Sequence, residues 1–163
     1  MKSGIVVQIP GFGELDIRTL VSDYTGTLSC GGKLTRGVRQ RLIALAKLVD
    51  IHILTADTFG TAGRELAKLP IAIHLLGPRR QDEQKARYVK RWALAHAAAL
   101  GNGNNDRLLL GAVRKAGGLA IGVDNGEGCA VATLQNANLF VVGAAKALDL
   151  LLEPARLKAT LRF

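Results

Sequence analysis

The chain has few cysteines and no long apolar run. Cys30 and Cys129 are its only cysteines, and neither lies in a CxxC or Cys/His spacing, which excludes a disulfide framework and a zinc site and indicates a reducing compartment. No apolar stretch reaches the roughly 18 residues that a membrane span needs. The N-terminal MKSGIVVQIP is too short and too polar for a signal peptide. We therefore expect a soluble, cytoplasmic protein.

Acidic and aromatic residues are also scarce. Thirteen Asp and Glu stand against 22 Lys and Arg, so the net charge is +9, and such a surface attracts polyanions and steers anionic substrates. Aromatic residues make up only 4% of the chain, and no basic helix is interleaved with them, so the pattern does not support a dedicated nucleic-acid binder. The 163 residues, 48% of them hydrophobic, suffice for one domain, residues 1–163, with a real core.

The pattern along the chain alternates short apolar runs with amphipathic segments. Ile5–Ile9 and Glu14–Ser22 flank a Pro-Gly-Phe-Gly turn and predict an N-terminal hairpin. Thr35 suits a helix N-cap, and a basic tail is expected from Pro154. Further strands are predicted at 51–55, 71–76, 119–123 and 139–142, and helices at 35–49, 60–69, 81–92, 106–116, 130–135 and 144–152. This order favours an α/β fold with a doubly wound, mainly parallel sheet and helices on both faces.

One segment gives conflicting signals. The alanine-rich stretch 93–100 favours a helix by propensity alone. The Gly-Asn-Gly-Asn-Asn-Asp loop at 101–106, however, suggests that a strand precedes it.

Polar residues follow the predicted strands, and in parallel sheets ligands bind at the carboxyl ends of the strands. Asp23 follows the first core strand, Thr55 the second, and Lys85 lies after the third. Asp106 belongs to the loop after the fourth. A carboxylate nucleophile, a hydroxyl, an ammonium and a second carboxylate fit phosphoryl transfer, in which Asp23 attacks phosphorus and Mg²⁺, held by Asp23, a backbone carbonyl and Asp106, offsets the charge. Thr55 and Lys85 would bind the equatorial phosphoryl oxygens.

These residues resemble the haloacid dehalogenase-like superfamily of phosphatases and phosphotransferases. Residues 23–28, Asp-Tyr-Thr-Gly-Thr-Leu, match its first motif, Thr55 the second, Lys85 the third and residues 101–106 the fourth. The whole pattern is similar to soluble P-type ATPase-like phosphatases. The resemblance implies a three-layer Rossmann-like fold, an aspartyl-phosphate intermediate and Mg²⁺, and it assigns 95–100 to the fourth strand. It also implies catalytic, phosphate-binding and metal-binding roles for Asp23, Tyr24, Thr25, Thr55, Ala56, Lys85, Asn102, Asn105 and Asp106.

Two positions depart from the family pattern. Thr25 stands where most of these phosphatases have the Asp that protonates the leaving group and activates water, and threonine cannot supply that proton. We therefore expect slow turnover. Asn102 stands where an Asp is the usual direct metal ligand. We therefore expect Asp106 to bind the metal directly, Asn102 to lie outside the direct ligands, and the site to bind Mg²⁺ weakly.

The spacing leaves no room for inserted domains. Residues 24–54 and 56–84 are too short for the nucleotide-binding domain of a P-type pump or for a cap domain, so an ion pump is excluded. The substrate would be a small phosphorylated compound or a phosphorylated macromolecule. Its selection would depend on residues 29–35, on a neighbouring subunit, or on a large substrate that seals the site itself. Cap-free relatives often form oligomers, and we expect a homo-oligomer.

Several of these residues have a second interpretation. Thr55 and Asp57 also suit helix caps, Lys90 competes with Lys85, and Asn105 either contacts phosphate or orders its loop. We expect solvated or structural roles for Arg79, Arg80, His52, His74, His96 and Glu127.

The leading hypothesis is a Mg²⁺-dependent phosphomonoester phosphatase. The main alternative is a weakly catalytic or non-catalytic phosphate-sensing module, which Thr25 and Asn102 favour. A nucleic-acid-associated protein rests on the charge alone.

Overall fold

The computed structural model describes residues 1–163 and builds them around one six-stranded sheet. The strand order is β10-β9-β8-β3-β6-β7, and all neighbouring strands are parallel, which confirms the predicted doubly wound sheet. The order reverses beside β3, so a ligand cleft is expected between the ends of β3 and its neighbours. The strands are β3 (Thr19–Ser22), β6 (Asp50–Thr55), β7 (Ala72–Leu75), β8 (Ala97–Gly101), β9 (Leu119–Asp124) and β10 (Leu139–Val142).

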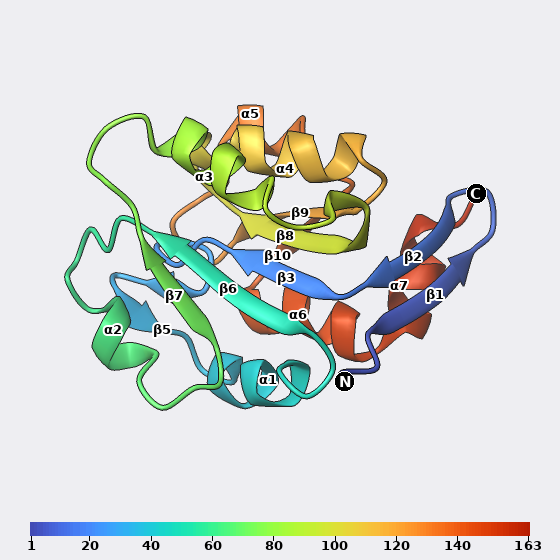
Figure 1. Cartoon of the computed structure of the whole chain (residues 1–163), viewed down its shortest axis with the longest axis horizontal. Coiled ribbons are helices and arrows are strands. Elements are labelled where there is room, and N and C mark those ends of the chain that lie inside the picture. The colour runs from blue at the N-terminus through green and yellow to red at the C-terminus, as the bar shows by residue number, and fades with distance from the viewer.

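Helices cover both faces of this sheet, so the predicted three-layer arrangement is confirmed (Figure 1). One face carries α3 (Gln81–Val89), α4 (Arg107–Lys115) and α5 (Val131–Leu134), and the other carries α1 (Val38–Leu45) and α6 (Ala144–Leu152). Between β3 and β6 the chain forms only a small hairpin, β4 (Ser29–Cys30) and β5 (Lys33–Leu34), and α1. No helix combines the length and apolarity that crossing a membrane requires.

The predicted N-terminal hairpin is present at one end of the molecule (Figure 1). Strands β1 (Ile5–Ile9) and β2 (Gly13–Ile17) pair antiparallel. Because β2 ends at Ile17 and β3 begins at Thr19, the run 14–22 forms two strands rather than one.

The C-terminal segment corrects the expectation of a basic tail. It forms helix α7 (Pro154–Leu161), in which Pro154 occupies the first turn, where its missing N–H costs nothing. Leu157 is fully buried in the main core together with Ile5 and Ile9 of the hairpin. The helix therefore covers the apolar face that the hairpin would otherwise expose.

Two predicted helices are shorter than their apolar patterns suggested. Helix α1 begins after Gly37, whose positive φ of 82° breaks the helical path, and Thr35 is not its cap because its hydroxyl lies 3.3 Å from the Leu28 carbonyl. Helix α2 spans only Ala62–Glu65, and Lys68 then adopts a positive φ of 64°.

The alanine-rich segment resolves in favour of the strand. A short 3₁₀ turn, Leu94–His96, leads into β8, whose five residues are all buried between β3 and β9. Small side chains are needed beneath α4, and this packing outweighs the helical propensity of alanine.

Candidate active site

A cleft of about 190 Å³ opens at the carboxyl ends of β3, β6 and β8, where the strand order reverses. It holds most of the residues singled out from the sequence. The cleft is lined by Asp23, Thr25, Thr55, Ala56, Thr58, Gln81, Asn102, Gly103, Asn105 and Glu127.

Asp23 is the first residue after β3 and is only 5% exposed. Its backbone N–H donates to the Leu100 carbonyl at 3.0 Å, which continues the pairing with β8 and fixes where the side chain starts. Its Oδ1 accepts a hydrogen bond from Lys85 Nζ at 2.7 Å. The Thr27 hydroxyl lies 3.2 Å from Asp23 Oδ2 and 3.0 Å from Asn102 Oδ1 and, with one proton, donates to one of them at a time.

Lys85 reaches the site from α3 and is buried between two carboxylates. Its Nζ lies 2.7 Å from Asp23 Oδ1 and 2.6 Å from Asp106 Oδ1. Burial opposes its charge, but Asp106 and then Asp23 hold the Lys85 pKa above its ordinary value. The rival Lys90 is exposed at the end of α3. The structure therefore brings Lys85, and not Lys90, to Asp23.

Asp106 is fully buried behind the cleft rather than in its lining. Besides Lys85, it accepts the N–H groups of Asn102 and Gly103 at 3.0 Å each on Oδ2. Position 101 requires glycine, because a Cβ there would lie 2.5 Å from Asp106 Cβ. Through these hydrogen bonds, Asp106 fixes the conformation of its own loop and the position of Lys85.

Asn102 faces the cleft instead, which is the reverse of the order expected from the sequence. Its Nδ2 donates to the Gly128 carbonyl at 3.2 Å, and this leaves Oδ1 on the side of Thr27 and Asp23. Its amide packs on Gly26, whose positive φ of 77° and missing Cβ make room for it.

The remaining predicted residues divide between the cleft and the core. Thr55 is buried at the cleft floor, and its Oγ1 accepts the Asp57 N–H at 2.9 Å. Asn105 lines the cleft and donates to Gln81 Oε1 at 2.9 Å, so it also orders its loop against α3. Tyr24 is different, because its side chain is fully buried and donates to the Gly32 carbonyl, away from the cleft.

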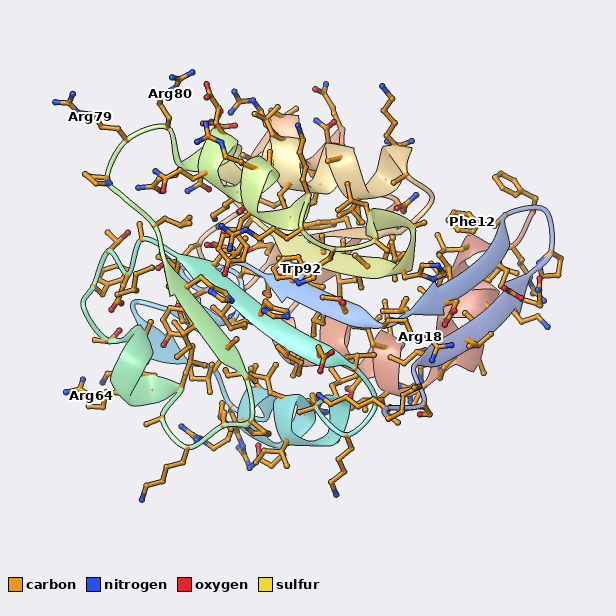
Figure 2. All side chains as sticks on the ribbon, in the orientation of Figure 1. Phe12, Arg18, Arg64, Arg79, Arg80 and Trp92 are labelled. Carbon is orange, nitrogen blue, oxygen red and sulfur yellow. The ribbon has the colours of Figure 1, made fainter.

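Residues expected to be structural or solvated mostly are so. Asp57 Oδ1 accepts the N–H groups of Thr61 and Ala62 and thereby caps α2. Arg79 and Arg80 point into solvent from the loop before α3 (Figure 2). His52 and His74 lie within hydrogen-bond distance of each other, 3.1 Å, and their rings contact those of Trp92 and Tyr88 respectively.

Glu127, for which a structural or solvated role was expected, lines the cleft, and so do Thr58 and Gln81, to which the sequence did not point. For Glu127 the available signal was its position in the Asp-Asn-Gly-Glu-Gly turn directly after β9. Thr58 and Gln81 carried none, because a lone hydroxyl and a lone amide are common on loops.

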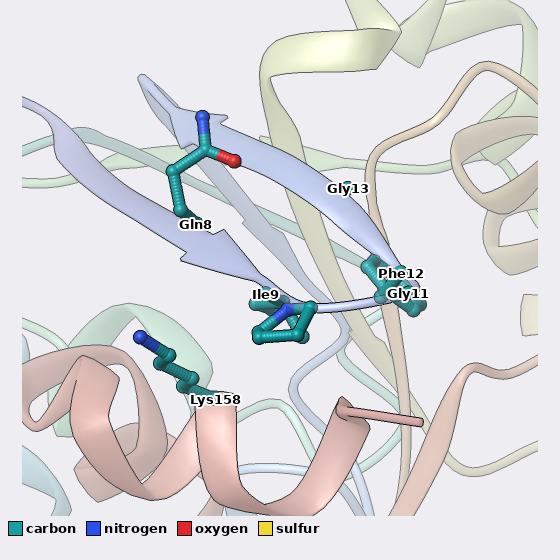
Figure 3. A pocket seen from close by; sticks show the side chains of 7 residues that line it. Gln8, Ile9, Gly11, Phe12, Gly13 and Lys158 are labelled. Atoms are coloured by element: carbon teal, nitrogen blue, oxygen red, sulfur yellow. The ribbon is translucent and has the colours of Figure 1, made fainter.

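A second, wider hollow of about 590 Å³ lies at the tip of the N-terminal hairpin (Figure 3). It is lined by residues 8–13 and Lys158. No carboxylate, histidine or hydroxyl faces it, so it offers no group for nucleophilic or proton-transfer chemistry.

The electrostatics of the cleft favour a bound cation. Burial, and then the charge of Asp106, raise the Asp23 pKa to about 6, against the opposing effect of Lys85. Two carboxylates facing one ammonium leave a net negative charge. No three His, Cys, Asp or Glu side chains converge as a ligand set, but Asp23 and the Asn102 amide oxygen are the hard oxygen donors that Mg²⁺ accepts, with water completing its shell. The donor set fits Mg²⁺.

Replacing Asp23 with Asn is expected to stabilise the metal-free protein. The native pKa lies above the unfolded value near 3.8, so the proton-binding stabilisation present at low pH is lost as pH rises through about 6. Above pH 6, Asp23→Asn should therefore raise the free energy of unfolding by on the order of 1–3 kcal/mol, and the gain should vanish towards pH 4.

Urea unfolding with EDTA at pH 4.5 and pH 7.5 measures this gain, with the exposed Asp50→Asn as the matched control. A variant less stable than the wild type at pH 7.5 would contradict the proposed cost of the Asp23 charge.

Comparisons with known proteins bear on the fold. No protein-family model matches the chain. A 39-residue stretch is 41% identical to an uncharacterized protein of Methanocaldococcus jannaschii and covers 24% of this chain and 89% of that protein.

Among solved structures, the chain resembles a 3-deoxy-D-manno-octulosonate 8-phosphate phosphatase of Moraxella catarrhalis, in complex with magnesium, phosphate and the sugar acid (TM-score 0.63, 17% identity, 90% and 94% of the two chains). It also resembles the cobalt-bound form of a deoxy-D-mannose-octulosonate 8-phosphate phosphatase from Haemophilus influenzae (TM-score 0.63, 13% identity, 90% and 89% of the two chains). A zinc-transporting P-type ATPase is similar over 78% of this chain but 20% of its own (TM-score 0.52, 21% identity).

Proposed function

The chain has the haloacid dehalogenase-like fold, and from this premise we propose that it is a Mg²⁺-dependent phosphomonoester phosphatase that uses Asp23 as its nucleophile. The observation that carries the proposal is the placement of Asp23. It is a buried carboxylate at the carboxyl end of a parallel strand. It is hydrogen-bonded to Lys85 and lines a cleft large enough for a phosphoryl group. The resemblance to P-type ATPases remains a looser likeness.

The residues of the cleft divide the work as follows. Above its pKa of about 6, Asp23 is an anion able to attack phosphorus. Lys85 is fixed by Asp106 beside Asp23, where it offsets the negative charge that gathers as the phosphoryl group approaches. Thr55 and Asn105 offer a hydroxyl and an amide to the equatorial oxygens.

We assign the metal to Asp23 and Asn102, because Asn102 lines the cleft and Asp106 does not. When bound, Mg²⁺ would neutralise the phosphoryl oxygens during transfer. Asp106 acts instead through Lys85 and through its own loop.

The size of the cleft limits the substrate. About 190 Å³ holds a phosphoryl group and a few atoms beyond it, so the rest of the substrate lies outside. We propose a small phosphorylated metabolite. The neighbours named for a sugar-acid phosphate make phosphorylated sugar acids the first compounds to test.

The test is release of phosphate from p-nitrophenyl phosphate and from a panel of phosphometabolites, with Mg²⁺ and with EDTA. We expect Mg²⁺-dependent release that Asp23→Asn abolishes. Phosphate binding without release would favour the sensing module instead, and release that survives Asp23→Asn would refute the role of Asp23.

Replacing Asn102 with Asp is expected to tighten Mg²⁺ binding about tenfold, since a second carboxylate adds charge attraction at the cation. Titrating Mg²⁺ against the rate of phosphate release measures the change. Asn104→Asp is the matched control, because Asn104 is exposed in the same loop and does not line the cleft. Equal increases in Mg²⁺ affinity in the two variants would show that the increase comes from the added negative charge of the protein and not from a ligand at position 102.

A further inference from the structure

The cleft contains one carboxylate besides the nucleophile. Of its ten lining residues, only Asp23 and Glu127 carry acidic groups, and none is a histidine, cysteine or lysine. Thr25 cannot exchange a proton near neutral pH, and Lys85 and Asp106 are bonded to each other outside the lining. Glu127 is therefore the group in the cleft that is free to move a proton.

The turn that carries Glu127 is held firmly. Asp124 Oδ1 accepts the N–H groups of both Gly126 and Gly128, at 2.9 and 3.0 Å, and both glycines have a positive φ that closes the turn. Asn125 Oδ1 accepts the Ala144 N–H at 3.0 Å and ties the turn to α6. These bonds fix the backbone from which Glu127 projects.

The Glu127 carboxylate also has a defined direction. Its Oε2 accepts the Gly31 N–H at 3.2 Å, which joins the turn to the β4–β5 hairpin across the cleft mouth. The other oxygen has no protein partner within hydrogen-bond distance and can act on substrate or water. Glu127 and Asp23 line the same cleft of about 190 Å³, which has room for a phosphoryl group and a water molecule.

We propose that Glu127 is the general acid and base of this phosphatase and does the work that Thr25 cannot. This inference rests on the proposed function. When Asp23 Oδ bonds to phosphorus, the bond from phosphorus to the leaving oxygen breaks, and Glu127 gives its proton to that oxygen. A water then attacks phosphorus, its proton passes to the Glu127 carboxylate, and the bond from phosphorus to Asp23 breaks, which restores both residues.

The test is Glu127→Gln, which keeps the acceptor for the Gly31 N–H but cannot donate or take the catalytic proton. The matched control is Glu65→Gln. Glu65 accepts the Leu34 N–H of the same hairpin at 3.0 Å and does not line the cleft. We expect kcat to fall at least about tenfold in Glu127→Gln and to stay unchanged in Glu65→Gln.

Two further readouts separate proton transfer from a structural role. The loss in Glu127→Gln should be greater for an alkyl phosphate than for p-nitrophenyl phosphate, whose leaving group needs no proton, and the pH–rate profile should lose one limb. Thr25→Asp should rescue Glu127→Gln and raise its rate by a larger factor than it raises the wild-type rate.

Each contrary result has a distinct meaning. Equal losses in both glutamate variants, or a loss of Mg²⁺ affinity with an unchanged leaving-group dependence, would overturn the role of Glu127 while leaving Asp23 in place. A wild-type protein that releases no phosphate would overturn both the proposed function and this inference.

Discussion

Lys85→Met is expected to lower the free energy of unfolding by on the order of 3–5 kcal/mol, because it leaves the buried Asp23 and Asp106 unpaired. Both carboxylates are almost fully buried, so water cannot replace the lost ammonium. The phosphatase rate should fall about 10²–10³-fold as well, which is the usual effect of removing a preorganised polar or charged group that stabilises the transition state, here the ammonium bonded to the nucleophile.

A double variant separates these two losses. Lys85→Met with Asp106→Asn removes one of the two unpaired charges, so it should recover part of the stability and none of the activity. Lys90→Met is the matched control, since Lys90 is exposed on the same helix, and should change the stability by no more than about 0.5 kcal/mol. Urea unfolding and initial rates with p-nitrophenyl phosphate measure both effects. A Lys85→Met variant as stable as the wild type would show that Lys85 does not neutralise this pair.

Thr25→Asp is expected to raise kcat for an aryl phosphate about 10²-fold, at the lower end of the usual range for general acid–base catalysis. Thr25 is half-buried in the cleft lining two residues after the nucleophile. A carboxylate there can protonate the leaving oxygen and then activate water for release of the adduct. The gain stays at the lower end because Glu127 already supplies part of this work from the cleft mouth.

The matched control for Thr25→Asp is Thr58→Asp, since Thr58 lines the same cleft from the loop after β6. A carboxylate at position 58 adds the same charge in another place and should give no acceleration. Steady-state rates across the pH range compare the two variants. If Thr25→Asp does not accelerate hydrolysis, slow turnover has a cause other than the missing acid–base group.

Most of the architecture and the centre of the site follow from the sequence. Buried parallel strands have short apolar sequences, and their carboxyl ends share one edge of the sheet, so the sequence alone predicts that Asp23, Thr55 and Lys85 lie together. The alanine-rich β8 needed more than propensity, because its strand character comes from its burial between β3 and β9.

Other features depended on contacts that a linear pattern does not contain. The turn of residues 101–106 decides whether Asn102 or Asp106 faces the cleft. Two backbone N–H groups in this turn donate hydrogen bonds to the Asp106 carboxylate and keep it out of the cleft. Helix α7 has a weak apolar stripe of its own and depends on the exposed underside of the hairpin. Glu127 lines the cleft because Asp124 closes its turn and because its carboxylate accepts the N–H of Gly31, a contact between distant parts of the chain.

The most direct test of the central claim is to trap the phosphorylated protein. The wild type and Asp23→Asn are mixed with Mg²⁺ and p-nitrophenyl phosphate, quenched in acid within the first turnovers, and examined by intact-protein and peptide mass spectrometry. We expect a single phosphoryl group on Asp23 of the wild type, which hydroxylamine removes and which is absent from Asp23→Asn. Release of phosphate with the phosphoryl group on another residue, or an Asp23→Asn variant as active as the wild type, would contradict the role of Asp23 as the nucleophile.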